Sequence, residues 1–217
     1  MNNQNAKINM ISQQLRTSDV LNESILALYA SLDRKAFLPS AYQDFGYSDM
    51  QIPLDAHNRL MTPAEEGKVL QALSIMPQDT VLEVGTGSGF FTALLSKLAR
   101  KVITLDIDAD RQHHAKTLLD ARQCHNVDYI TADGSDGYMN KAPYDVIVVT
   151  GGLTSITQSL RSQLAPNGRI FAIVGQSPAM QGVLLHLTDD RVWHKSVLFE
   201  TEMPYLKTAS AKEAFIF

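Results

Sequence analysis

The 217-residue sequence predicts an α/β fold: a doubly wound, mostly parallel sheet of seven strands with an antiparallel hairpin strand, preceded by an N-terminal helical extension. Three observations predict it. The apolar run 81–84 leads into three alternate glycines and an amphipathic segment, typical of strand, turn and helix. Further apolar runs alternate with helical patterns, as in a parallel α/β sheet. The last two β-rich segments, 183–187 and 191–199, flank Thr188-Asp189-Asp190 as a hairpin would.

The first 62 residues predict two short helices and an irregular stretch. Apolar residues recur at helical spacing on both sides of a break at residues 17–19: Ile8, Ile11 and Leu15, then Ile25, Leu28, Tyr29 and Leu32. Asn22 is a candidate cap for the second helix. Thr62-Pro63-Ala64-Glu65 predicts a capping box that opens the next helix. We therefore expect residues 1–62 to form N-terminal helices and a substrate-side loop, and residues 63–217 to form a cofactor-binding core.

The core elements follow in order along the chain. They are a strand at 81–84, a helix at 91–99, strands at 102–105, 127–131 and 144–150, a helix at 155–164 and a strand at 169–174. The 144–150 segment is almost wholly apolar, as a central parallel strand buried on both faces should be. A turn is expected at Pro166-Asn167-Gly168.

Composition narrows the function classes. The single cysteine, Cys124, excludes an internal disulfide, and no apolar run approaches the ~20 residues of a membrane helix. The polar start predicts no secretory segment, so we expect a cytoplasmic protein with no membrane partner. A net charge of −4 without a Lys/Arg cluster argues against nucleic acid as a partner. The scattered histidines predict no metal site.

The three alternate glycines predict a nucleotide pocket. Gly85, Gly87 and Gly89 let the backbone approach a ligand, and the following helix directs its free N–H groups at it. A dinucleotide fingerprint requires a sixth-position glycine, where this chain has Phe90, which disfavours a nicotinamide oxidoreductase. With the acidic Glu83 ahead of it, the motif resembles the first motif of S-adenosylmethionine-dependent methyltransferases. A carboxylate there suits an ammonium and a sulfonium better than a pyrophosphate.

Two strand ends complete the predicted pocket. Asp106 follows Gly85 by 21 residues, close to the ~20 expected for an acid that binds ribose hydroxyls. Asp133 is a candidate partner for an adenine amino group, and the alternative for each acid is an ordinary solvated or turn position. The predicted cofactor-binding residues are Glu83, Gly85, Thr86, Gly87, Ser88, Asp106, Ile107, Asp133, Gly134 and Thr150.

Over nearly its whole length the chain resembles the protein-L-isoaspartate O-methyltransferase family. The matching segments, in the family's order and spacing, are Gln14-Leu15-Arg16, Phe37-Leu38-Pro39, Tyr47-Ser48-Asp49, 81–89, Asp133-Gly134-Ser135, Tyr144-Asp145 and 164–169. The resemblance implies a Rossmann-like methyltransferase fold and S-adenosyl-L-methionine as cofactor. It also implies a damaged protein or peptide as substrate, methylated on the α-carboxylate of L-isoaspartyl residues for protein repair, and a monomeric cytoplasmic enzyme.

One segment departs from the family pattern. The family carries a Thr-Ile-Ser triplet over the active site, and this chain reads Arg59-Leu60-Met61, followed by Thr62. The serine that orients the substrate carboxylate in the family is thus replaced by Met61, whose thioether cannot donate a hydrogen bond. The four residues 59–62 remain the substrate-side candidates. Two alternatives stay open: methylation of another acceptor such as a small molecule, and a non-catalytic module that binds S-adenosylmethionine.

Overall fold

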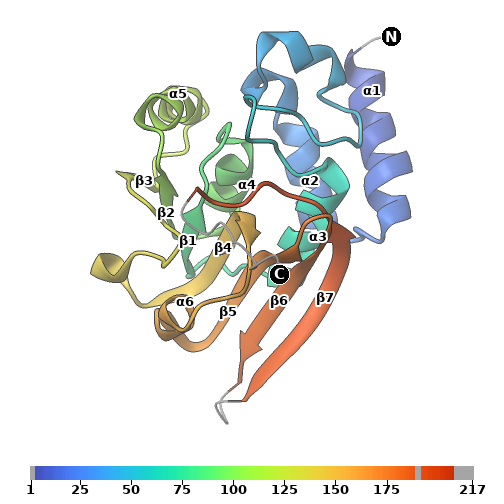
Figure 1. The fold of residues 1–217 in the computed structure, drawn as a ribbon. Coiled ribbons are helices and arrows are strands. Elements are labelled where there is room, and N and C mark those ends of the chain that lie inside the picture. Colours follow the sequence, from blue (N-terminus) through green and yellow to red (C-terminus); the bar gives the residue numbers. More distant parts are fainter. Residues whose placement is uncertain (1–2, 189–191, 208–217) are drawn as a thin grey trace, which may run out of the picture.

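The structure is a computed structural model, and it describes residues 3–188 and 192–207 (Figure 1). A seven-stranded sheet lies at its centre in the order β3-β2-β1-β4-β5-β6-β7. The strands are β1 (Thr80–Val84), β2 (Lys101–Asp106), β3 (Val127–Thr131), β4 (Tyr144–Leu153), β5 (Leu164–Gln176), β6 (Ala179–Leu187) and β7 (Trp193–Thr201). The first five pair in parallel, and β6 runs antiparallel to both of its neighbours. The predicted fold class is confirmed, and the turn residues Asp189 and Asp190 of the predicted hairpin lie outside the described residues.

Alternation along the strands buries both faces of the sheet. Val81 and Val102 belong to one apolar cluster, and the next residues in each strand, Leu82 and Ile103, belong to a second cluster on the opposite face. Successive side chains of a strand point to opposite faces, so a run apolar at every position can be buried on both sides.

Helices of unequal size cover the two faces. The α-helices are α1 (Asn3–Asn9), α2 (Glu23–Ser31), α3 (Pro63–Leu73), α4 (Phe90–Leu98), α5 (Ala109–Asp120) and α6 (Gln158–Ser162). Residues of α2 to α5 share the first cluster with the sheet, and α6 contributes Leu160 to the second. The N-terminal helices therefore pack into the same core as the sheet, beside α3 (Figure 1).

The caps of two helices agree with the sequence prediction. The Asn22 side chain accepts hydrogen bonds from Ser24 N and Ile25 N at the start of α2. At α3, the Thr62 hydroxyl accepts from Glu65 N while the Glu65 carboxylate accepts from Thr62 N, which completes the capping box. This cap fixes the point at which the 59–62 segment enters the core.

Three local predictions differ from the structure. The first helix continues from α1 through a π-helical turn, Met10–Leu15, which buries Met10 and Leu15 and leaves Ile8 54% exposed. The expected helix at 155–164 contains only the five residues of α6. The Pro166-Asn167-Gly168 turn lies inside β5, where the pairing with β4 shifts register and Asn167 adopts a φ of 60°.

Candidate active site

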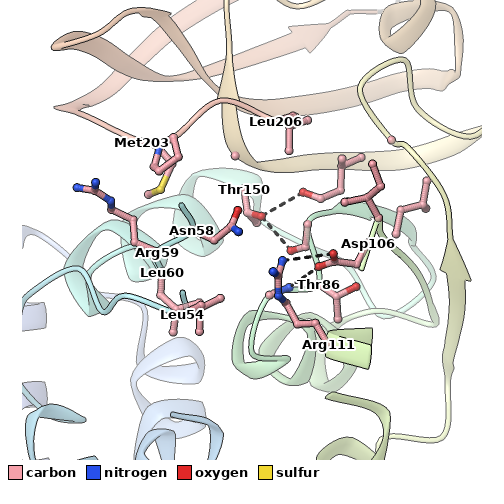
Figure 2. A pocket seen from close by; sticks show the side chains of 18 of the residues that line it. Leu54, Asn58, Arg59, Leu60, Thr86, Asp106, Arg111, Thr150, Met203 and Leu206 are labelled. Atoms are coloured by element: carbon pink, nitrogen blue, oxygen red, sulfur yellow. Dashed lines mark hydrogen bonds and ion pairs between the residues drawn. The ribbon is translucent and has the colours of Figure 1, made fainter. Parts of the chain in front are cut away.

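A pocket opens at the carboxyl edge of the parallel strands, where β1, β2 and β4 end (Figure 2). Its lining comes from separate stretches of the chain: Leu54 and 58–61, Glu66, 84–88 with Phe91, 105–107 with Arg111, 132–134 with 150–151, and 203–207. Every predicted cofactor-binding residue except Glu83 belongs to this lining. Among the substrate-side candidates, Arg59, Leu60 and Met61 line the pocket and Thr62 does not.

The glycine turn forms the floor of the pocket. Gly85, Gly87 and Gly89 have φ angles of 98°, 55° and 85°, a region that side-chain-bearing residues adopt only at a cost. A side chain at Gly85 would also collide with the hydroxyl of Thr150. That hydroxyl donates to the backbone oxygens of Val84 and Gly85 at 3.1 and 2.9 Å, so Thr150 ties the end of β4 to the turn.

Asp106 connects the glycine turn to α5. Its Oδ2 accepts from Gly87 N at 3.1 Å, and its Oδ1 accepts from Asp108 N at 3.0 Å. The Arg111 guanidinium turns toward the same carboxylate, with Nη1 at 3.4 Å from Oδ1 (Figure 2). The neighbouring Ile107 leaves 46% of its surface exposed in the pocket lining. A buried carboxylate such as that of Asp106 can accept hydrogen bonds from a ribose, and the exposed side chain of Ile107 beside it can pack against a flat base.

Asp133 and Gly134 form the adjoining wall after β3. The Asp133 Oδ1 accepts from Ser135 N at 2.9 Å, which shapes a tight turn. A Cβ at Gly134 would lie 2.6 Å from a methyl of Val84, so only glycine lets this turn approach β1. The turn after β3 therefore packs against the end of β1 across the intervening β2, and the adenine role of Asp133 stays a prediction.

The structure differs from the prediction at Glu83. This residue is fully buried behind the turn, where its Oε2 accepts from the hydroxyls of Thr92 and Thr104, both at 2.6 Å. The Thr104 hydroxyl in turn lies 2.7 Å from that of Thr86. Burial raises the pKa of Glu83 to about 8, although both hydrogen bonds favour the ionised form. Glu83 therefore supports the turn from behind and does not present a carboxylate to the pocket.

Glu66 is a pocket residue that the sequence analysis missed. It lies on α3 and is 1% exposed, and its Oε2 lies 3.5 Å from Nε of the equally buried Arg34. Burial raises the pKa of Glu66 to about 7, although the charge of Arg34 pulls it down. The sequence around Glu66 indicates only an acid in the first turn of a helix, beside Glu65, and carries no local signal of burial.

Arg34 anchors the substrate-side segment, residues 59–62, from the protein core. Its Nη2 donates to the backbone oxygen of Met61 at 2.9 Å, and the Met61 side chain is 4% exposed. Arg59 is exposed and lies at the opposite end of the pocket from Asp106 (Figure 2). Thr62 directs its hydroxyl to the capping box. Met61 and Arg59 therefore face the pocket, and Thr62 stabilises α3.

Residues 203–207 form a strap along the rim. After β7 the chain turns back across the end of the sheet (Figure 1). Gly152 N donates to Pro204 O at 2.8 Å, and Leu206 N donates to Gly152 O at 3.0 Å. A Cβ at Gly152 would lie 2.8 Å from Met203 O. The close approach of the strap to β4 therefore requires glycine at position 152.

Comparison with known proteins agrees with this architecture. The family model for protein-L-isoaspartate(D-aspartate) O-methyltransferase matches residues 4–200. A protein-L-isoaspartate O-methyltransferase of Roseobacter denitrificans is 38% identical over 177 residues, which is 81% of this chain and 83% of the relative. One from Aliivibrio fischeri is 35% identical over 172 residues, covering 79% and 83% of the two chains.

Two solved structures share the fold. One, a protein-L-isoaspartate O-methyltransferase, superposes with a TM-score of 0.78 at 21% identity and covers 92% of this chain and 65% of its own. The other, a Plasmodium falciparum structure assigned to the same enzyme, holds S-adenosyl-L-homocysteine and superposes at 0.76 with 18% identity over 95% and 99% of the chains. The family-model match and the similarity to the bacterial enzymes identify this chain as a member of the protein-L-isoaspartate O-methyltransferase family.

Proposed function

We propose that this chain is an S-adenosylmethionine-dependent methyltransferase that methylates the α-carboxylate of L-isoaspartyl residues in damaged proteins. The observation that carries the proposal is the juxtaposition of two parts in one pocket. The glycine turn with Asp106 supplies a nucleoside site, and the 59–61 segment forms the opposite wall. Family membership names the reaction that joins them.

The residues of the pocket fit the cofactor. Asp106, Ile107 and Asp133 all line the pocket. In this proposal Asp106 accepts hydrogen bonds from ribose hydroxyls, Ile107 packs against adenine, and Asp133 accepts from the adenine amino group. At Gly87 the turn carries no side chain that would keep a ligand away from its backbone. These assignments are part of the proposal.

Glu66 completes the fit at the amino-acid end of the cofactor. It is the acid in the pocket lining from α3, and its pKa of about 7 leaves it readily ionised beside a cation. An ammonium group would supply the opposite charge that favours the carboxylate. We therefore assign to Glu66 the role that the sequence analysis gave to Glu83.

The reaction depends more on positioning of the methyl acceptor than on acid–base catalysis. The cofactor supplies an electrophilic methyl group, and a substrate carboxylate with a reference pKa of ~4 is ionised at neutral pH without a general base. This chain's contribution is to hold the acceptor and exclude water. Arg59 provides a cation for the carboxylate, and Leu60 and Met61 provide an apolar wall.

The direct test is methyl transfer to a pair of peptides that differ only in an L-isoaspartyl or a normal aspartyl linkage. We expect methyl ester formation and S-adenosylhomocysteine release with the isoaspartyl peptide alone. Equal turnover of the two peptides would contradict the proposed specificity. Tight cofactor binding without turnover of either would favour a different acceptor, or a non-catalytic module, as the buried Met61 in place of a serine allows.

The cellular location, oligomeric state and partners of the enzyme are proposed from its composition and family. No helix among residues 3–188 and 192–207 is long and apolar enough to cross a membrane. Those residues also contain no group of three or more His, Cys, Asp or Glu side chains placed to hold a metal ion. We propose a monomeric cytoplasmic enzyme acting on damaged proteins, with residues 1–62 on the substrate side and 63–217 carrying the cofactor.

A further inference from the structure

Arg111 lies where the cofactor side and the substrate side of the pocket meet. It is on the first turn of α5, and its guanidinium reaches three carboxylates at once. Nη2 lies 2.7 Å from Asp55 Oδ2 and 3.3 Å from Asp108 Oδ2, and Nη1 lies 3.4 Å from Asp106 Oδ1. Asp55 and Asp106 are separated by 51 residues in sequence. The Arg111 side chain thus links the loop that contains Asp55 to the end of β2 at Asp106.

The Asp55 end of the bridge belongs to a compact loop, which we call the 53–59 loop. Pro53 and Arg59 form an isolated antiparallel bridge at its base. Inside it, Asp55 Oδ1 accepts from His57 N at 2.7 Å and from Asn58 N at 2.8 Å. Burial would raise the pKa of Asp55, but these hydrogen bonds, with the charge of Arg111, hold it below its usual range. Asp55 is therefore an ionised partner that organises the loop it belongs to.

The 53–59 loop covers the glycine turn. A Cβ placed on Gly87 would lie 3.5 Å from side-chain atoms of both Leu54 and Leu60. The loop also carries Asn58 and Arg59 into the pocket lining. An interaction that orders this loop therefore also positions the acceptor side of the site relative to the cofactor side.

The Asp106 end of the bridge is buried and already part of the cofactor site. Its side chain is 5% exposed, against 21% for Arg111 and 39% for Asp55. The contact with Arg111 is the longest of the three ion pairs, at 3.4 Å. A ligand that engages Asp106 shares this carboxylate with Arg111 and changes the charge balance that holds Arg111 between the two acids.

We propose that Arg111 is a positioning residue that couples cofactor binding at Asp106 to the ordering of the 53–59 loop, and through it to acceptor binding. The inference rests on the proposed function for the identity of the two ligands. It adds a thermodynamic link between them: occupancy of the nucleoside site strengthens acceptor binding, and the strengthening passes through Asp55 and Arg111.

Three variants test the link. Arg111→Ala removes the bridge. Asp55→Asn keeps a side-chain oxygen for His57 and Asn58 and removes the charge that Arg111 contacts. Lys116→Gln is the matched control, because Lys116 lies on the same helix in an exposed pair with Asp120. Thermal unfolding of each variant establishes that it is folded.

The first readout uses S-adenosylhomocysteine and needs no turnover. Hydrogen exchange of residues 53–60 is compared with and without the ligand, and calorimetry gives its Kd. We expect ligand-induced protection of the loop in the wild type and in Lys116→Gln, and its loss in Arg111→Ala and Asp55→Asn. The Kd should rise about three- to tenfold in Arg111→Ala, as for a partly exposed charge network.

The second readout separates positioning from a general structural defect. In steady-state assays the KM for an isoaspartyl peptide should rise about three- to tenfold in Asp55→Asn and Arg111→Ala, with kcat changed less than twofold. The double variant should be no worse than Arg111→Ala, because both changes break one bridge. Additive effects, or loop protection that survives in Arg111→Ala, would overturn the coupling. Failure of the wild type to bind S-adenosylhomocysteine would overturn the proposed function and, with it, this inference.

Discussion

The buried guanidinium of Arg34 donates a 2.9 Å hydrogen bond to the backbone oxygen of Met61 and anchors the substrate-side segment from within the protein core. The Arg34 Cζ also lies over the ring of Phe90, 5.6 Å from the ring centroid, and Phe90 is in the first turn of the helix that follows the glycine motif. The segment that departs from the family pattern is therefore held by the same core that supports the cofactor turn. This hydrogen bond is made to a backbone oxygen, so it does not require a particular side chain at position 61.

This anchoring makes Met61→Ser an informative substitution. If a hydroxyl at position 61 can reach the reacting carboxylate, turnover of an isoaspartyl peptide should rise. A hydrogen bond to a charged group, worth about 1.5–3 kcal/mol, corresponds to roughly ten- to hundredfold when it acts in the transition state. The Met61 side chain is buried, so we also expect a loss of stability of about 2–3 kcal/mol. Methyl ester formation and thermal unfolding measure the two effects, with cofactor affinity as control.

Unchanged or lower turnover in a folded, cofactor-binding Met61→Ser protein would contradict the expectation. The acceptor would then be oriented by other groups, and Arg59 is one charged candidate in the pocket lining.

Thr62→Ala distinguishes a helix cap from a substrate contact. The Thr62 hydroxyl accepts from Glu65 N at 3.2 Å, and loss of such a cap costs about 1 kcal/mol. We expect the free energy of unfolding to fall by about that amount, with little change in turnover per folded molecule, and Thr62→Ser to behave as wild type. Urea unfolding and methyl-transfer assays provide the measurements. A large loss of turnover at unchanged stability would show that the hydroxyl serves the acceptor.

Asp106→Ala should weaken the binding of S-adenosylhomocysteine. Its carboxylate is buried in the pocket and holds Gly87 N, so the substitution removes an acceptor for the ligand and loosens the turn. A loss of about 1.5–3 kcal/mol predicts a Kd roughly ten- to hundredfold higher by calorimetry. Asp128→Asn is a suitable control, because Asp128 lies on β3 and pairs with Lys101 and Lys141 away from the pocket lining. Equal affinity in wild type and Asp106→Ala would place the ribose elsewhere.

The elements that the sequence predicts correctly are those with a local signal. The glycine turn, the capping box at Thr62 and the apolar strand that ends at Asp106 each depend on residues a few positions apart. Backbone preference and strand alternation then determine their structure, whatever the rest of the chain does.

The parts that the sequence does not predict depend on distant partners. Arg34 reaches Met61 across 27 residues, and Arg111 reaches Asp55 across 56. Nothing in the neighbourhood of either arginine indicates a bridge rather than a solvated side chain. The prediction for Glu83 differs from the structure for a related reason. The sequence predicts its place near the end of β1, but the direction of its carboxylate depends on hydrogen bonds from Thr92 and Thr104, which the sequence does not indicate.

The burial of Glu83 predicts a pH dependence of stability. The usual pKa of a glutamate side chain is 4.5, and that of Glu83 in the folded protein is about 8. Between these values the folded state therefore holds a proton that the unfolded state releases. The contribution of Glu83 is fully present below the unfolded value and is lost as pH rises through the folded one. The free energy of unfolding of the wild type should therefore fall with pH, relative to that of Glu83→Gln, between about pH 4.5 and about pH 8.

Urea unfolding of the two proteins across this window gives the difference directly. Glu66, whose pKa is raised to about 7, adds a slope of the same sign to both proteins, so the comparison isolates Glu83. Glu200→Gln, which changes an exposed carboxylate on β7, should run parallel to the wild type. If Glu83→Gln also runs parallel to it, Glu83 is ionised throughout, and a carboxylate charge behind the glycine turn must be balanced by a group other than the two threonine hydroxyls.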